Sequence, residues 1–230
     1  MIAMKQKLVF WDWTGTLIDE SRLDEAVCKS MEEEVAKKNN ISFKDAEKRF
    51  RNHLKKLENT WEWHDYVLHG RILGVDWRNH QEKHLKELIL LPYAKEILKY
   101  ARESGCKNVL ATNAVRAVIL LRAGHAGLLD LFDAIVTSDD VKALKSEGKH
   151  FEYGLKNLNG DPESSFSIGD NPVQDILSAK RLGLRTIYCD FGQNLTHYHS
   201  EHISNEHMES TAADYTVADL SEVKGIINGV

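Results

Sequence analysis

Short apolar runs alternate with helical patterns along most of this chain, and this alternation constrains the fold more than any other feature. The run from Leu8 to Trp11 is continuously apolar and too short for a helix, which is typical of a strand buried in a parallel sheet. Similar runs lie at 109–111, 134–136, 166–168, 186–188 and 215–217, and helical patterns follow most of them. Alternating strands and helices predict an α/β fold with a doubly wound parallel sheet.

Proline and glycine indicate where some of the intervening helices begin and end. Pro92 suits the first turn of a helix that we expect over 93–103. A helix expected over 173–182 would stop at Gly183, since glycine is common just beyond a helix end.

Residues 20–90 differ, because strand-like runs disappear and helical periodicity takes over. Early in this stretch an apolar residue recurs at every fourth position, as on one face of a helix: Leu23, Val27, Met31 and Val35. Ser42 and Asp45 resemble a capping box that begins a second helix, whose apolar face would hold Phe43, Ala46, Phe50, Leu54 and Leu57. Two more helical segments follow, around 61–68 and 77–88.

We therefore predict two domains. Residues 1–18 and 92–230 would form the α/β core, and residues 19–91 an all-helical domain inserted after the first strand. The hinges between the two would lie near Asp19 and Leu91.

Composition indicates a soluble globular protein. The chain has 42% hydrophobic and 28% charged residues, as ordinary globular proteins do, and a net charge of -5 argues against nucleic-acid or acidic-membrane binding. Its three cysteines, Cys28, Cys106 and Cys189, lack metal-ligand spacing and are expected to be reduced thiols. No apolar stretch has the length of a membrane span, and the run after Lys7 is too short for a signal peptide. We expect a cytoplasmic monomer or homodimer.

Polar residues follow several of the predicted strands at the end where α/β sheets bind ligands. Asp12 follows the first strand, and Gly15 permits a tight turn beyond it. Thr112 and Asn113 follow the run at 109–111, and Asp170 follows the run at 166–168. From the local sequence alone, Asp12 serves equally well as a cap for the next element.

These residues stand in motifs that resemble the haloacid dehalogenase superfamily of aspartate-nucleophile hydrolases. D-W-T-G-T-L, from Asp12 onward, resembles the first motif, usually D-x-D-G-T-L, and I-G-D-N-P-V-Q-D, from Ile168 to Asp175, resembles the fourth, G-D-x-x-x-x-D. Thr112 resembles the Ser or Thr of the second motif. The resemblance implies a Rossmann-like core with an inserted helical cap.

The third motif requires a lysine, and Lys145 is the candidate. A strand exit and D-x-V precede it and a phenylalanine follows six residues later, as in the family pattern. The proline that usually follows this lysine is replaced by Ser146, so Lys149 remains an alternative. A fixed cation is needed to offset the dianionic phosphate and the Asp12 carboxylate.

The resemblance implies a role for each residue in a phosphatase reaction. Asp12 would attack phosphorus and form an aspartyl-phosphate. Mg²⁺ would bind Asp12, the backbone carbonyl of Thr14 and Asp170, while Asp175 would orient waters or Lys145. Gly15, Thr112, Asn113 and Lys145 would bind the phosphoryl group of the substrate.

Thr14 departs from the family pattern, in which this position holds a second aspartate that acts as general acid and base. A threonine hydroxyl does not titrate near neutral pH, and acid–base help is worth about 10²–10⁴-fold. The sequence therefore predicts a slow phosphatase that favours good leaving groups and has a long-lived phosphoenzyme.

Relatives that lack the same acid offer other interpretations. P-type ATPases have membrane spans, of which this sequence shows none. Phosphonoacetaldehyde hydrolases need a Schiff-base lysine, for which Lys29 is available. Haloacid dehalogenases do without Mg²⁺. The two acids of the fourth motif favour a metal-dependent phosphatase over a dehalogenase. A phospho-ligand sensor without turnover is a further alternative.

The inserted helices would select the substrate, a small phosphorylated metabolite. They concentrate aromatic and cationic residues, of which most tryptophans are expected to be core: Trp61, Trp63, His64, Tyr66, Arg71, Trp77 and Arg78. The segment 194–207 holds four histidines, whose spacing matches no metal-ligand pattern, so we interpret it as a polar loop.

Overall fold

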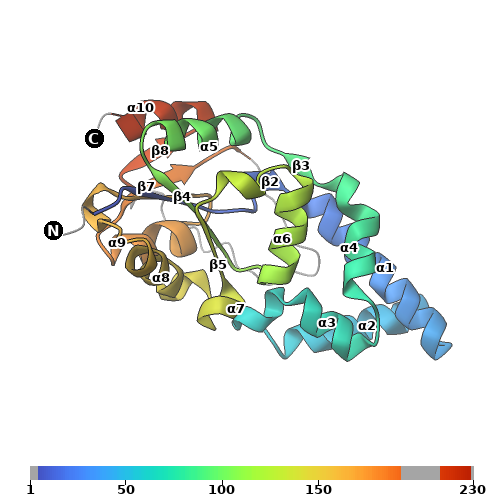
Figure 1. Cartoon of the computed structure of the whole chain (residues 1–230). Helices are drawn as coiled ribbons and strands as arrows, with labels where there is room; N and C mark the ends of the chain where they lie inside the picture. Colours follow the sequence, from blue (N-terminus) through green and yellow to red (C-terminus); the bar gives the residue numbers. More distant parts are fainter. Residues whose placement is uncertain (1–4, 193–212, 229–230) are drawn as a thin grey trace.

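The computed structural model describes residues 5–192 and 213–228, and a six-stranded parallel sheet forms its centre (Figure 1). The strands lie in the order β5-β4-β1-β6-β7-β8. Their bounds are Leu8–Trp11 for β1, Lys107–Thr112 for β4, Ala134–Thr137 for β5, Phe166–Gly169 for β6, Arg185–Cys189 for β7 and Tyr215–Val217 for β8. Each predicted strand is present, and the doubly wound parallel sheet is confirmed.

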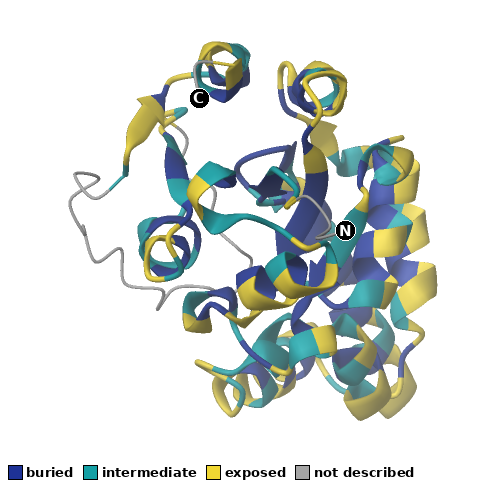
Figure 2. Ribbon diagram, turned by 60° about the vertical axis from the view of Figure 1, so that its left-hand side comes forward, coloured by how far each residue is buried: buried dark blue, intermediate teal, exposed yellow. Residues whose placement is uncertain are grey.

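Helices cover both faces of the sheet because the central strands are apolar on both sides. In β1, Val9 and Trp11 pack with α5 (Ala94–Glu103), α6 (Arg116–His125) and α10 (Val223–Asn228). The alternate residues Leu8 and Phe10 pack on the opposite face with α8 (Lys149–Asn157) and α9 (Ser178–Lys180). This two-residue alternation places the core on both faces, as the dark blue strands between partly exposed helices show (Figure 2).

Two helices differ in detail from the prediction. α5 begins at Ala94, because Tyr93 has a left-handed backbone conformation with φ of 64°. The helix expected over 173–182 is wider at its start, a π-helix at Pro172–Leu177 (η6) that continues into α9. Asn171 caps it by accepting hydrogen bonds from the backbone N–H groups of Val173 and Gln174. The local pattern predicted a helix there but not its width.

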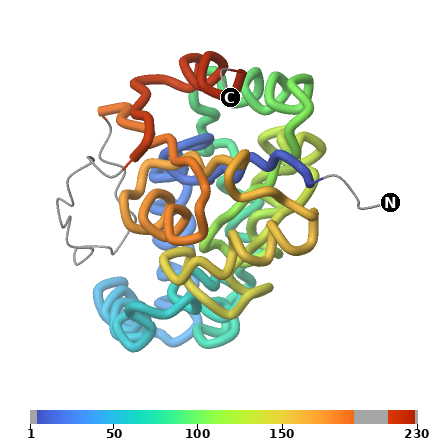
Figure 3. The backbone as a smooth tube through the Cα atoms, turned by 90° about the vertical axis from the view of Figure 1, so that its left-hand side faces the viewer, coloured from blue at the N-terminus to red at the C-terminus, as the bar shows by residue number. Residues whose placement is uncertain are grey.

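A helical segment, residues 21–87, leaves the sheet after β1, and we call it the helical insert. It contains α1 (Ser21–Asn39), α2 (Phe43–Lys55), η1 (Trp61–His64), α3 (Tyr66–Leu73), α4 (Trp77–His84) and η2 (Leu85–Glu87). The short strands β2 (Ile18–Asp19) and β3 (Ile89–Leu90) pair antiparallel at its base, so the chain enters and leaves at one place. α2 and α3 lie at the opposite end of the molecule from α5 and α10 (Figure 3).

The insert has an apolar core of its own. The four predicted residues of α1, from Leu23 to Val35, are all buried there beside Ala46. Ser42 caps α2 by accepting a hydrogen bond from the backbone N–H of Asp45 at 3.1 Å. Phe43, predicted on the apolar face, is instead 43% exposed. The insert thus packs internally, and its division from the rest as a separate domain stays a prediction.

Three other predictions concern the cysteines, membrane spans and the histidine-rich segment. All three cysteines are free and buried. Within residues 5–192 and 213–228, no helix combines the length and apolar character needed to cross a membrane. The histidine-rich segment 194–207 lies outside the described residues.

Candidate active site

Three acidic side chains meet at the carboxyl edge of the central strands. Trp11 at the end of β1 lies opposite Leu110 of β4 and Ile168 of β6, so these strands leave the sheet at the same level. One carboxylate oxygen each from Asp12, Asp170 and Asp175 lies within 4.8 Å of the others. The structure therefore brings together three of the acids that the motifs predicted.

Gly15 brings the loop after β1 against Asp170. Its φ of 82° favours glycine, and a Cβ atom built there would lie 2.1 Å from Asp170 Oδ2. The loop backbone and the Asp170 carboxylate are therefore in direct contact, a packing that no larger residue at position 15 permits.

Lys145 supplies the positive charge of the cluster. Its ammonium group contacts the Asp12 carboxylate and lies 2.6 Å from Asp175 Oδ1, and the side chain is almost completely buried. Burial lowers the pKa of Lys145, but the two carboxylates outweigh it and raise the pKa above its usual value. The alternative, Lys149, is exposed and pairs with Glu147 at 3.3 Å. The geometry thus favours Lys145.

The acids outnumber the cations at this point, which fits a divalent metal ion. Burial and then the charges of Asp12 and Asp175 raise the pKa of Asp170 well above its ordinary value. Three carboxylates and one ammonium leave a deficit of positive charge, and carboxylate oxygens are the ligands that Mg²⁺ prefers. The donor set of this chain therefore suits Mg²⁺, a cofactor that stays a prediction.

Thr112 and Asn113 lie beside Lys145 at the end of β4. Thr112 Oγ1 accepts a hydrogen bond from the backbone N–H of Ala114 at 3.1 Å. Asn113 Oδ1 accepts from the backbone N–H of Lys145 at 2.8 Å, and Asn113 Nδ2 donates to Gln174 Oε1 at 2.8 Å. The Asn113 side chain therefore holds the lysine loop in place, and its predicted contact with substrate remains untested.

Thr14 contacts a cluster that the sequence did not predict. Its hydroxyl donates to Glu20 Oε1 at 2.6 Å, and Glu20 is buried at the start of α1. Glu20 Oε2 accepts from Trp13 Nε1 at 2.9 Å and from Arg122 Nη1 at 2.6 Å. Arg122 comes from α6, 102 residues further along the chain. No sequence pattern indicated this contact, because Glu20 and Arg122 lie far apart along the chain.

Arg122 links the sheet side of the molecule to the helical insert. Its Nη2 donates to Asp24 Oδ1 of α1 at 2.8 Å and its Nε to Gln81 Oε1 of α4 at 3.0 Å. The guanidinium carbon lies 5.4 Å from the ring centroid of Tyr66 in α3. Three helices of the insert therefore converge on one arginine of α6.

The other residues singled out in the insert lie in different surroundings. The Nζ atom of Lys142 lies over the ring of Trp61, 4.4 Å from the ring centroid. This contact joins η1 to the end of α7 (Ser138–Val141). Arg71 and Arg78 are exposed, and Arg78 pairs with Glu82 at 2.9 Å. Trp63, His64 and Trp77 are half-buried. Lys29, considered as a Schiff-base lysine, is exposed and pairs with Glu25.

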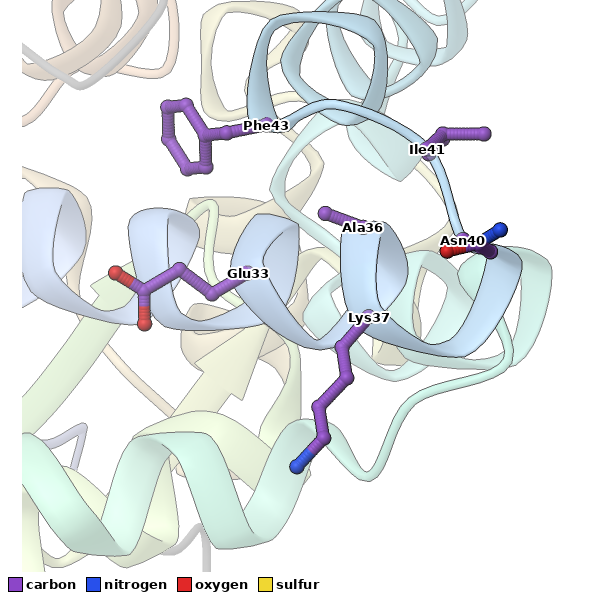
Figure 4. A pocket seen from close by; sticks show the side chains of 6 residues that line it. All are labelled: Glu33, Ala36, Lys37, Asn40, Ile41 and Phe43. Carbon is purple, nitrogen blue, oxygen red and sulfur yellow. The ribbon is translucent and has the colours of Figure 1, made fainter.

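A surface hollow on the insert is separate from the acidic cluster. It lies between the end of α1 and the start of α2, and its lining residues are Glu33, Ala36, Lys37, Asn40, Ile41 and Phe43 (Figure 4). None of them is a residue that the motifs predicted for the site.

Comparison with known proteins agrees with this geometry. A family described as haloacid dehalogenase-like hydrolase matches residues 6–183, and one described as HAD-hydrolase-like matches residues 144–223. The chain is 24% identical over 233 residues to the glyceraldehyde 3-phosphate phosphatase of Pyrococcus furiosus, covering 96% of this chain and 92% of that protein.

Two further similarities point the same way. The ribulose-1,5-bisphosphate 5-phosphatase of Halopiger xanaduensis is 26% identical over 145 residues, which cover 63% of this chain and 59% of that relative. This chain therefore spans about three fifths of the length of that relative. Among solved structures, a HAD phosphatase from Thermococcus onnurineus has a TM-score of 0.81 and 26% identity, covering 97% of this chain and 99% of that one. With a family match over residues 6–183 and the expected acids at the strand ends, this chain belongs to the haloacid dehalogenase-like hydrolases.

Proposed function

We propose that this hydrolase cleaves phosphoric monoesters of small metabolites through an aspartyl-phosphate on Asp12, with Mg²⁺ as cofactor. The observation that carries the proposal is the meeting of Asp12, Asp170 and Asp175 around the Lys145 ammonium group. Two similar proteins are named as phosphatases of glyceraldehyde 3-phosphate and ribulose-1,5-bisphosphate, which supports a small phosphorylated substrate.

The residues of the cluster suit an in-line transfer to a carboxylate. Asp12 would attack phosphorus with one carboxylate oxygen as the bond to the leaving oxygen breaks, and water would then release phosphate. Lys145, held between Asp12 and Asp175, is a fixed cation for the phosphoryl oxygens. Because Thr112 Oγ1 accepts from Ala114 N–H, its own proton is free to bond the phosphoryl group.

Mg²⁺ would be held by the carboxylates of Asp12 and Asp170 and the carbonyl of Thr14, where it would supply charge neutralisation for the transferring phosphoryl group. The raised pKa of Asp170 supports this assignment, because the buried carboxylates lack a sufficient counter-charge among themselves. Asp175 would not bind the metal ion directly but would hold the Lys145 ammonium group in position.

The helical insert would act as a cap over the cluster. The pairing of β2 with β3 gives both connections one base, near the predicted hinges at Asp19 and Leu91. Contacts of Arg122 and of Lys142 with the insert support a closed arrangement, in which water is excluded from the reacting groups.

Turnover would be slow, because Thr14 supplies no titratable group beside the leaving oxygen. Leaving groups that depart without a proton, such as aryl and acyl phosphates, would react best, and the phosphoenzyme would be long-lived. Loss of acid–base help predicts a deficit of about 10²–10⁴-fold against alkyl phosphates.

Release of phosphate from an aryl phosphate, with and without Mg²⁺, tests this function. We expect Mg²⁺-dependent release that Asp12→Asn abolishes and that the surface variant Asp161→Asn, which changes an acid paired with Lys5, retains. Phosphate binding without release would indicate a sensor, and release that survives Asp12→Asn would refute the nucleophile. A panel of phosphorylated metabolites would then identify the substrate.

A further inference from the structure

Glu20 stands out because the proposed reaction gives it no role, although it is buried and hydrogen-bonded to a residue of the first motif. It is 4% exposed, and its Oε1 lies 2.6 Å from Thr14 Oγ1. Thr14 is half-buried, two residues after Asp12 on the same turn. The position that most departs from the family motif is therefore the one that Glu20 contacts.

The direction of this hydrogen bond follows from the other partners of Glu20. Its Oε2 accepts from Trp13 Nε1 at 2.9 Å and from Arg122 Nη1 at 2.6 Å. A carboxylate paired with a guanidinium accepts hydrogen bonds and has none to donate, so Thr14 is the donor. A hydroxyl carries one proton, and with that proton directed at Glu20 its oxygen offers only lone pairs elsewhere.

We infer that Glu20 is a positioning residue for the hydrolysis of phosphorylated Asp12, an inference that rests on the proposed function. By holding the Thr14 proton, Glu20 makes the Thr14 oxygen an acceptor for one proton of the attacking water. This contact directs the water oxygen at phosphorus without removing a proton from it.

The step balances without a base at position 14. The water oxygen bonds to phosphorus, the bond between phosphorus and the Asp12 oxygen breaks, and its electron pair returns to the Asp12 carboxylate. The second proton of the water passes to a phosphoryl oxygen, so the products are the free carboxylate and dihydrogen phosphate. Neither Thr14 nor Glu20 changes its protonation state.

The helical insert fixes the carboxylate that does the positioning. Arg122, which holds Glu20 Oε2, is itself bonded to Asp24 of α1 and Gln81 of α4. The orientation of Thr14 therefore depends on the insert being seated against α6. Water capture at Asp12 and closure of the insert would be coupled through this one arginine.

Rapid-quench measurement with an aryl phosphate and Mg²⁺ separates formation of the phosphoenzyme from its hydrolysis. In Glu20→Gln, the amide oxygen would face Trp13 and Arg122, and the amide N–H₂ would donate to Thr14 and reverse the bond. We expect hydrolysis to slow about tenfold, the value of one hydrogen bond, while formation stays within about twofold of wild type.

Two comparisons make the test specific. Glu25→Gln, which alters an exposed acid of the same helix that pairs with Lys29 and lies outside this cluster, is the matched control and should retain both rates. Thr14→Val removes the acceptor, so adding Glu20→Gln to it should cause no further slowing. Thr14→Ser should hydrolyse as wild type does, because it keeps the hydroxyl.

If Glu20→Gln does not fold, Glu20→Asp provides a second test. The shorter side chain keeps a carboxylate beside Arg122 but withdraws it from Thr14. It should show the same selective slowing. Three outcomes would overturn this inference and leave the proposed function standing. They are an equal loss of both rates, hydrolysis at the wild-type rate in Glu20→Gln or Glu20→Asp, and further slowing when Glu20→Gln is added to Thr14→Val. A wild-type enzyme without any phosphoenzyme would overturn the proposed function as well.

Discussion

Replacing Arg122 with methionine tests whether one buried cation holds the insert against α6. Methionine keeps most of the apolar length but leaves the buried carboxylates of Glu20 and Asp24 without a counter-charge. The arginine is 2% exposed, so water cannot replace the lost partner. Removing one partner of a buried ion pair costs about 3–5 kcal/mol, a large part of the roughly 5–15 kcal/mol that stabilises a typical protein.

Thermal unfolding followed by circular dichroism gives the measurement. For a chain of this size each kcal/mol corresponds to about 2–4 °C, so Arg122→Met should lower Tm by roughly 6–20 °C. Arg116→Met is the matched control on the same helix, because that arginine is 40% exposed and pairs with Asp140 at the surface. Surface pairs are worth about 0–1 kcal/mol.

A loss in Arg122→Met no larger than in Arg116→Met would refute the reasoning. A second variant distinguishes loss of the counter-charge from loss of packing around Arg122. Replacing a whole buried ion cluster with apolar residues is often neutral for stability. Adding Glu20→Leu and Asp24→Leu to Arg122→Met should therefore recover most of the lost stability. If the triple variant is less stable than the single one, uncompensated charge is not the cause.

Three other predictions concern the site and the buried histidines. Thr14→Asp should raise turnover of alkyl phosphates by up to about 10²–10⁴-fold in steady-state assays, and no gain would contradict the account of this position. Mg²⁺ at a hundredfold excess over Kd should add about 2.7 kcal/mol of stability in thermal-shift assays, and Asp170→Asn should lose that gain. Burial lowers the pKa of His69 and of His150 to about 4, with the charge of Lys145 contributing at His150. Unfolded histidine titrates near 6.5, so their neutral forms contribute full stability above about pH 6.5 and lose it as the pH falls toward 4. Urea unfolding should show a loss of about 2 kcal/mol per histidine between pH 7 and 5, and an unchanged midpoint would exclude this effect.

The strands and the acids at their ends were predictable because their signals are local. Leu8–Trp11 is apolar at every position, and a strand buried on both faces requires that pattern whatever surrounds it. Asp12 and Asp170 follow two such strands directly, so the sheet topology alone brings them to one edge. These predictions needed no knowledge of side-chain packing.

The choice between Lys145 and Lys149 was not settled by spacing, because both lysines lie in the segment that follows β5 and are close together along the chain. Gly148, with φ of 83°, turns the chain between them, so that Lys145 is buried while Lys149 is exposed at the first position of α8. Left-handed residues other than glycine, such as Tyr93 and Lys142, likewise change direction without a sequence signal. The contact of Glu20 with Arg122 joins residues 102 positions apart, which no periodicity predicts.

Thr14 and Glu20 are best understood as a matched pair. An aspartate at position 14 would place a carboxylate where the threonine hydroxyl now donates to Glu20 at 2.6 Å, and two carboxylates at that distance repel. The repulsion would raise the pKa of the introduced acid, which favours its action as a proton donor but strains the pairing of Glu20 with Arg122. Restoring the family motif at one position alone should therefore reduce stability while it raises turnover, and adding Glu20→Gln should recover the stability because the amide can donate to the new carboxylate.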